Sequence, residues 1–125
     1  MKEAGQIVLF RFPQADLGEG KLRPALLLGK LPGELDDWLI CMISTQLRHC
    51  VPNFDEIVRP DDPDFVESGL KTESLIRTGR LAVVETGILL GAIGRIAPER
   101  LLGIKTSLSR WLTETGGSTN VTTST

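Results

Sequence analysis

Short apolar runs, bounded by glycine, proline and acidic residues, recur along most of the chain. Unbroken runs of this length, rich in β-branched and aromatic residues, are typical of buried strands rather than helices. The run at residues 38–45 is almost wholly apolar, so we place it at the centre of a sheet. The predicted strands and extended pieces cover residues 5–12, 23–30, 38–45, 56–59, 73–78, 81–85 and 92–96, with Thr78-Gly79 separating the fifth from the sixth.

One clear helix is predicted at residues 97–112, where apolar residues follow helical spacing instead. Pro98 suits the first helical position, and Glu99 in the first turn complements the helix dipole. We interpret the apolar stripe of this helix as core-facing, with a partner surface as the alternative. The stripe consists of Leu101, Ile104, Leu108, Trp111 and Leu112. Upstream, the loop at residues 60–69 is expected to contain one helical turn that Gly69 ends.

This order of elements predicts an α+β domain, with a small, strongly bent antiparallel sheet or partly open barrel and a terminal helix packed on it. A chain of 125 residues fits one domain, which we place at residues 1–113. Residues 114–125 have almost no apolar content and are expected to form a flexible polar tail. No apolar segment approaches the ~18 residues of a membrane span. No signal-peptide pattern is present either, so we expect a cytoplasmic protein.

The net charge of −2, from 14 Lys and Arg against 16 Asp and Glu, is unlike that of a general nucleic-acid binder. The charges are unevenly distributed, because residues 46–50 and 75–81 are locally basic whereas residues 52–69 are acidic. A small basic groove on a mildly acidic body therefore fits the sequence. In the acidic stretch, Asp61 and Asp62 are adjacent in a proline-flanked loop, and we interpret them as a solvated turn.

Metal and cofactor motifs are absent from the sequence. Cys41 and Cys50 are nine positions apart, and only one histidine accompanies them, which is no metal-binding pattern. Cys41 lies in an apolar run and is interpreted as a core residue. There is no phosphate-binding glycine loop and no conventional hydrolase or metalloprotease motif. We expect no cofactor and no metal site.

Arg23 is the first candidate for chemistry, because it stands directly before Pro24 and the apolar residues 25–28. Proline fixes its own φ and biases the preceding residue toward extended geometry, so the arginine is held where a strand begins. A positioned guanidinium binds a phosphate through two parallel hydrogen bonds. The alternative is a solvated charge at the end of a strand.

A polar cluster that follows the third predicted strand is the second candidate. It consists of Ser44, Thr45, Gln46, Arg48 and His49. The alternative is simple strand termination, which serine and threonine often provide. His49 is the only side chain that ordinarily titrates near neutral pH, so it would assist proton transfer if it pointed into a groove. A solvated loop histidine is the alternative.

Four segments, in order, resemble the MazF/PemK toxins of bacterial toxin–antitoxin systems, and in particular their PemK-like branch. Residues 5–29 have the glycine turn, the apolar strand ending in Phe, the glycine-containing loop and the Arg-Pro before another apolar strand. Residues 40–46 resemble the next strand of the family, which ends in hydroxyl residues and glutamine. Residues 68–81 resemble the Gly-Leu-Lys segment that ends in arginine, and residues 90–101 the start of the terminal helix. Together the matches span roughly residues 5–112.

The resemblance implies an SH3-like small barrel, a strongly bent antiparallel sheet with a C-terminal helix, working as a homodimer. It implies a metal-independent endoribonuclease that cleaves single-stranded RNA by attack of a 2′-hydroxyl on the adjacent phosphate. Its implied partners are messenger RNA and a cognate acidic antitoxin protein. The alternative is a non-enzymatic interaction module of the same fold, either a degenerate toxin or a protein binder like the gyrase inhibitors.

The family's catalytic arginine falls on Arg23, and its catalytic threonine falls on Ser44, which keeps the hydroxyl. Because Thr45 follows where the family often has serine, the resemblance leaves open which hydroxyl is catalytic. The resemblance and the local basic charge together assign RNA binding to Thr45, Gln46, Arg48, Arg77 and Arg80. Gly79-Arg80 stands where the branch usually has an Asp-Lys pair, a departure that bears on RNA sequence preference.

Overall fold

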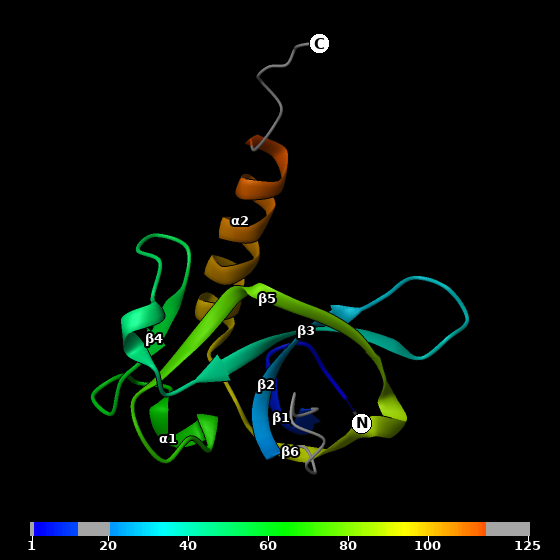
Figure 1. The fold of residues 1–125 in the computed structure, drawn as a ribbon, viewed down its shortest axis with the longest axis horizontal. Helices are drawn as coiled ribbons and strands as arrows, with labels where there is room; N and C mark the ends of the chain where they lie inside the picture. Colours follow the sequence, from blue (N-terminus) through cyan, green and yellow to red (C-terminus); the bar gives the residue numbers. More distant parts are fainter. Residues whose placement is uncertain (1, 13–20, 115–125) are drawn as a thin grey trace.

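The fold is an open, curled antiparallel sheet with one long helix packed on one of its faces (Figure 1). A computed structural model describes residues 2–12 and 21–114. Their strands follow the order β4-β5-β3-β2-β1-β6, and every pairing is antiparallel. The strands are β1 (Gln6–Phe12), β2 (Lys21–Lys30), β3 (Asp37–Ser44), β4 (Glu56–Val58), β5 (Ser74–Glu85) and β6 (Leu89–Arg95). The helices are α1 (Phe65–Ser68) and α2 (Pro98–Glu114), with 3₁₀ turns η1 (Leu47–His49) and η2 (Thr86–Ile88).

The expected α+β class and the bent sheet with a C-terminal helix are confirmed. The strand placed at the centre, β3, lies between β2 and β5, and the sheet curls without closing, so β4 and β6 are its edges. Gly69 ends α1 in the left-handed conformation, with φ of 75°, as expected of a glycine C-cap. No helix in the described ranges is long and apolar enough to cross a membrane. The loop at 13–20 and most of the expected tail, residues 115–125, lie outside the described residues.

Two apolar clusters lie on opposite faces of the sheet. Successive side chains of a strand point to opposite faces, so Leu26 belongs to one cluster and Leu27 to the other. The first cluster includes Ile104 and Leu108 of α2, and the second covers the face away from the helix. Burial on both faces explains why β2 and β3 are unbroken apolar runs instead of alternating ones.

The expectation that the whole stripe of α2 faces the core is wrong at its C-terminal end. Ile104 and Leu108 are buried, and Leu101 packs against them, but Trp111 and Leu112 are 48% and 59% exposed. Figure 1 shows why, because the C-terminal half of α2 rises beyond the sheet that the first half covers. Trp111 keeps a tilted ring contact with Phe54, with 6.2 Å between the centroids.

The expected break at Thr78-Gly79 is also wrong, since residues on both sides of it form one strand, β5. Pairing with β3 is maintained across the dipeptide: Met42 pairs with Arg77, and the adjacent Cys41 pairs with Leu81. Residues 78–80 therefore form a bulge inside a continuous strand. The Thr-Gly pair marks this bulge and not a turn.

Arg100, in the first turn of α2, joins three elements through buried or half-buried ion pairs. Its guanidinium pairs with Glu56 at 2.9 Å, Asp62 at 2.9 Å and Asp64 at 2.8 Å. Asp64 also accepts a hydrogen bond from the Ala97 amide at 2.9 Å, which fixes the start of α2. The interpretation of Asp62 as part of a solvated turn is therefore wrong.

Candidate active site

Arg23 and Ser44 are brought together by the register of β2 and β3. Ala25 is paired with Met42, and extending this register by two residues sets Arg23 opposite Ser44. The ladder with β3 stops at Ala25, directly after Pro24, while β2 continues to pair with β1. On that side Arg23 lies opposite Phe10, a member of the second apolar cluster. The backbone of Arg23 is thus paired with β1 on one side and has no strand pairing on the side of β3.

Arg77 and Arg80 lie on the same sheet face because of the bulge in β5. Three positions apart in a regular strand, they would point to opposite faces. The bulge shifts the pairing of β5 with β3 by an odd number of residues. The alternation of β5 side chains between the two sheet faces is therefore inverted across the bulge. Arg77 shares the face of its partner Met42, and Arg80 shares the face of Ala82, which packs with Met42 against the second cluster.

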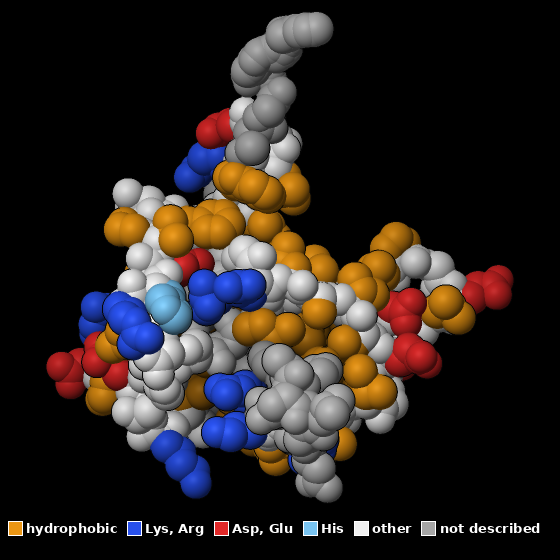
Figure 2. Space-filling model, viewed as in Figure 1, with side chains coloured by type: hydrophobic (Ala, Val, Ile, Leu, Met, Phe, Trp, Pro, Cys, Tyr) orange, Lys and Arg blue, Asp and Glu red, His pale blue; other side chains and the backbone are white. Residues whose placement is uncertain are grey.

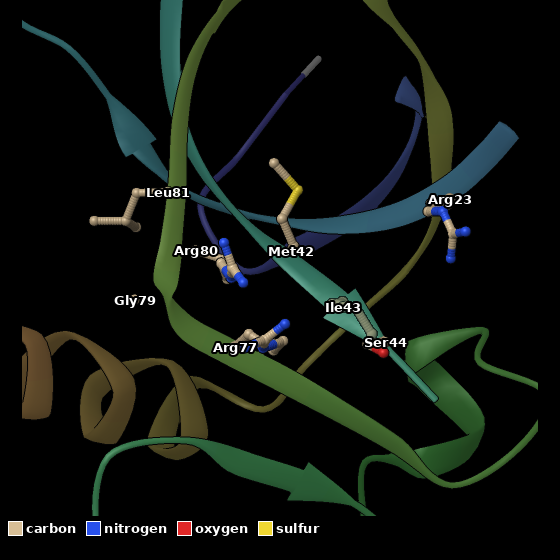
Figure 3. Close-up of a pocket in the computed structure, with 8 residues that line it drawn as sticks. All are labelled: Arg23, Met42, Ile43, Ser44, Arg77, Gly79, Arg80 and Leu81. Carbon is tan, nitrogen blue, oxygen red and sulfur yellow. The ribbon is translucent and has the colours of Figure 1, made fainter. Parts of the chain in front are cut away.

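These side chains line one cavity of about 520 Å³, on the sheet face away from α2. Its lining residues are Arg23, Met42, Ile43, Ser44, Arg77, Gly79, Arg80 and Leu81. In Figure 3, Arg23 comes from β2 on one side, Arg77 and Arg80 come from β5 on the other, and Ser44 lies at the end of β3 between them. The structure therefore brings together four residues that the sequence suggested, from three strands.

The cavity is cationic. No acidic side chain is among its described lining residues, and within residues 2–12 and 21–114 neither Arg23, Arg77 nor Arg80 forms an ion pair. Figure 2 shows Lys and Arg side chains over the middle and left of the drawn face, while acidic side chains lie at its right-hand end, at its left edge and beside the long helix. Three uncompensated guanidinium groups around one cavity suit a ligand that carries several negative charges.

Ser44 has a hydrogen-bonding capacity that is only partly used. Its Oγ accepts a hydrogen bond from the Gln46 amide at 3.0 Å. A hydroxyl has one O–H donor in addition to its acceptor sites. Ser44 donates no hydrogen bond to another described residue, so its O–H stays available to a ligand in the cavity.

The other candidates of the polar cluster follow Ser44 but do not line this cavity. Arg48 donates from Nη1 to Oε1 of Gln46 at 2.5 Å, and His49 ends the short η1 turn. The contribution of Thr45, Gln46 and Arg48 to RNA binding, and that of His49 to proton transfer, stay predictions.

Two features of the site were not found from the sequence. One is the apolar part of the lining, above all Met42. Because Met42 lies within an apolar strand run, its sequence context predicts a core residue. The other is Asp55, whose carboxylate accepts hydrogen bonds from the Thr78 and Val51 amides, each at 2.9 Å. Nothing local marks a contact between residues 55 and 78, so only the fold could reveal it.

The described residues contain neither a metal-binding cluster nor a reactive thiol at Cys41. In that part of the chain no group of three or more His, Cys, Asp or Glu side chains could hold a metal ion. Burial, together with the nearby charge of Asp55, raises the pKa of Cys41 to about 12. Cys41 is therefore a protonated core thiol, as expected, and not a nucleophile.

Comparison with known proteins places this geometry in context. The sequence matches the family described as PemK-like, MazF-like toxin of type II toxin-antitoxin system, over residues 3–112. No curated protein sequence matches the chain. Among solved structures, the fold is similar to an endoribonuclease in complex with its cognate antitoxin from mycobacterial species. That similarity has a TM-score of 0.61 and 16% identity, and covers 91% of this chain and 97% of the other.

Proposed function

The chain belongs to the family of PemK-like, MazF-like toxins of type II toxin–antitoxin systems, and we propose that it is an endoribonuclease that cleaves single-stranded RNA. The observation that carries this proposal is the cavity lined by Arg23, Ser44, Arg77 and Arg80. It offers several guanidinium groups and a hydroxyl to a chain of phosphates. The similar endoribonuclease fold adds support at the level of architecture.

The proposed reaction is an internal transfer at phosphorus. The ribose 2′-oxygen bonds to the adjacent phosphorus, and the bond from phosphorus to the 5′-oxygen of the next nucleotide breaks. The products are a 2′,3′-cyclic phosphate and a 5′-hydroxyl. The 2′-hydroxyl loses its proton to solvent water, and the departing 5′-oxygen takes one from solvent. No metal ion or other cofactor takes part in the proposed scheme.

Arg23 stabilises the transition state in this scheme. Negative charge builds on the non-bridging phosphate oxygens, and preorganised donors directed at such charge are often the largest catalytic term. A guanidinium keeps its proton at neutral pH, so Arg23 acts as a hydrogen-bond donor and not as a base. Ser44 uses its free O–H to orient the phosphate or the 2′-hydroxyl.

The remaining residues bind RNA on either side of the cleaved bond. Arg77 and Arg80 contact phosphates from β5. Thr45, Gln46 and Arg48, which continue directly from Ser44, contact the nucleotides that leave the cavity on that side. His49 is proposed to assist these proton transfers to and from solvent water when RNA is bound.

The proposed partners are a second copy of the chain, messenger RNA and an acidic antitoxin. An acidic peptide suits the same free guanidinium groups as RNA does, so it would inhibit by occupying the RNA site. The similar solved structure contains an endoribonuclease with its antitoxin, which supports this kind of partner.

A cleavage assay tests the proposal. Purified protein is incubated with a long single-stranded RNA in the presence of EDTA, with the Arg23→Ala protein, purified identically, as the control for contaminating nuclease. We expect discrete fragments ending in a 2′,3′-cyclic phosphate from the wild type alone. Intact RNA would favour the non-enzymatic interaction module instead, and cleavage that EDTA abolishes would refute the metal-free scheme.

A further inference from the structure

The bulge in β5 needs support from outside the sheet. β4 pairs with β5 only from Ser74 to Ile76, so the outer edge of β5 is without a strand partner from Arg77 onward. An amide left unpaired beside a buried segment is costly. Thr78 lies in this stretch and is fully buried. Its N–H therefore requires an acceptor that β4 does not provide.

Asp55 provides that acceptor. Its Oδ1 accepts the Thr78 N–H at 2.9 Å, across 23 positions of sequence. Its Oδ2 accepts the Val51 N–H at 2.9 Å, which closes the turn that precedes β4. One carboxylate thus joins the turn at residues 51–55 to the bulge at residues 78–80.

A second contact holds the same junction. Gly79 lies against the ring of Phe54, so closely that a Cβ at this position would be 3.2 Å from Cε2 of that ring. Phe54 and Asp55 also line a second cavity, of about 410 Å³, which shares Arg77, Gly79 and Arg80 with the first. The turn at residues 51–55 therefore packs against the bulge and limits the conformations that the bulge can adopt.

We propose that Asp55 is a positioning residue, whose carboxylate fixes the β5 bulge so that Arg77 and Arg80 both face the RNA. It forms no ion pair with either arginine among the described residues, so it acts through the Thr78 backbone. This inference rests on the proposed function, because it assigns a purpose to the shared direction of the two guanidinium groups. Without the hydrogen bonds to Asp55, β5 loses the odd register shift that reverses which sheet face its side chains point to. Arg77 and Arg80 then no longer share a face.

The proposal predicts which property changes when Asp55 is replaced. Arg23 and Ser44 lie on β2 and β3, away from the hydrogen bonds of Asp55. The kcat should therefore change little while KM rises. Each arginine that no longer reaches a phosphate should lower the slope of log Kd against log salt by about 0.7, the value for single strands. A role confined to stability would lower the melting temperature and leave both the slope and KM unchanged.

The experiment compares Asp55→Ala and Asp55→Asn with the wild type, and uses Asp36→Ala as the matched control. Asp36 accepts a hydrogen bond from Trp38 in the connection between β2 and β3, so its loss removes the same kind of side chain and an accepted hydrogen bond away from the cavity. Binding is measured over a range of salt with a 2′-O-methylated oligoribonucleotide, which lacks the attacking hydroxyl. KM and kcat are measured with unmodified RNA.

We expect Asp55→Ala to weaken binding with a slope smaller by about 0.7 to 1.4. Asp55→Asn should lie between Asp55→Ala and the wild type, because its one carbonyl oxygen can accept only part of what the carboxylate accepts. Asp36→Ala should match the wild type. Unchanged slope and KM in folded Asp55 variants would overturn the inference. So would folded Asp55 variants whose only change is a lower melting temperature, since Asp55 would then serve stability alone. A wild-type protein that binds RNA without cleaving it would instead count against the proposed function.

Discussion

Asp64 holds Arg100 through two hydrogen bonds, from Nε to Oδ2 at 2.8 Å and from Nη2 to Oδ1 at 3.0 Å. The side chains of the pair are 4% and 14% exposed, so water screens them little. Because Asp64 precedes α1 and Arg100 lies in the first turn of α2, this pair fixes the long helix to the loop that precedes the short one. The cavity lies on the opposite sheet face, so the ion pair concerns stability and not chemistry.

Replacing Arg100 by methionine should strongly destabilise the protein. Breaking a buried ion pair leaves an uncompensated charge, which typically costs about 3–5 kcal/mol. Urea unfolding at pH 7 measures the loss. Arg110→Met, at an exposed position of the same helix, is the matched control and should leave the midpoint almost unchanged. Equal midpoints for both variants would show that the Arg100 network contributes nothing to stability.

The same network should make the protein sensitive to acid. Hydrogen bonds from Arg100 lower the pKa of Asp64, and the Arg59 amide followed by Arg100 lowers the pKa of Asp62, both against the opposing effect of burial. A carboxyl whose pKa is lower in the folded state stabilises it fully above its unfolded pKa of about 3.9. This contribution is lost as the pH falls through the folded pKa. The difference in unfolding free energy between wild type and Arg100→Met should therefore be flat above about pH 5 and shrink below it. A difference independent of pH would contradict the assignment.

The parts of the fold that depend on local pattern could be predicted from the sequence. Apolar runs located the strands, Pro98 the start of α2 and Gly69 the end of α1. The break proposed at Thr78-Gly79 was wrong because a local turn signal cannot report pairing with β3 across it. The exposed end of the α2 stripe was missed because periodicity does not reveal where the covering sheet ends.

The candidate site could be predicted only residue by residue. Arg23, Ser44, Arg77 and Arg80 were each suggested by the sequence, and the register of three strands explains why they meet. Asp55 and the partners of Arg100 were not predicted, because their contacts join residues 23 to 44 positions apart. Long-range polar contacts of this kind produce no repeating pattern of residues along a sequence.

Removing the guanidinium of Arg23 should abolish most cleavage while the protein stays folded. Loss of one preorganised donor typically lowers the rate by ~10²–10³, and an exposed residue at this position contributes little to the core. Arg23→Lys should also be poor, since an ammonium cannot reproduce the planar pair of donors. Single-turnover cleavage and thermal unfolding give the two readouts, with Arg110→Ala as the charge-matched control. Near-wild-type rates in a folded Arg23→Ala protein would remove Arg23 from the site.

The protein should be a symmetric homodimer whose RNA groove runs across the interface. Light scattering at micromolar concentration should give twice the 13.6 kDa of one chain. If both copies build the groove, cleavage activity per chain should fall on dilution in step with the fraction of dimer. A monomer at micromolar concentration, or activity per chain that does not change as the dimer dissociates, would contradict the prediction.

The antitoxin and RNA should compete for the same guanidinium groups. We expect the neighbouring gene to encode a short protein with an acidic C-terminal segment, and that segment alone should inhibit cleavage. An acidic, largely disordered peptide that folds on binding meets the free arginines with charge-assisted hydrogen bonds. Because these contacts are exposed, its binding should weaken as salt rises.

Arg77→Glu tests this shared site, because it places a negative charge in a cavity that Arg23 and Arg80 also line. Binding of 2′-O-methylated RNA and of the acidic segment is followed by fluorescence anisotropy, with Arg110→Glu as the control for net charge. Both ligands should bind more weakly to Arg77→Glu, since both are anions that require the same donors. If neither affinity changes, the groove has been assigned wrongly, although the family still stands. If only RNA binding weakens, the antitoxin must inhibit from another surface, because a peptide that occupied the cavity would meet the same new charge.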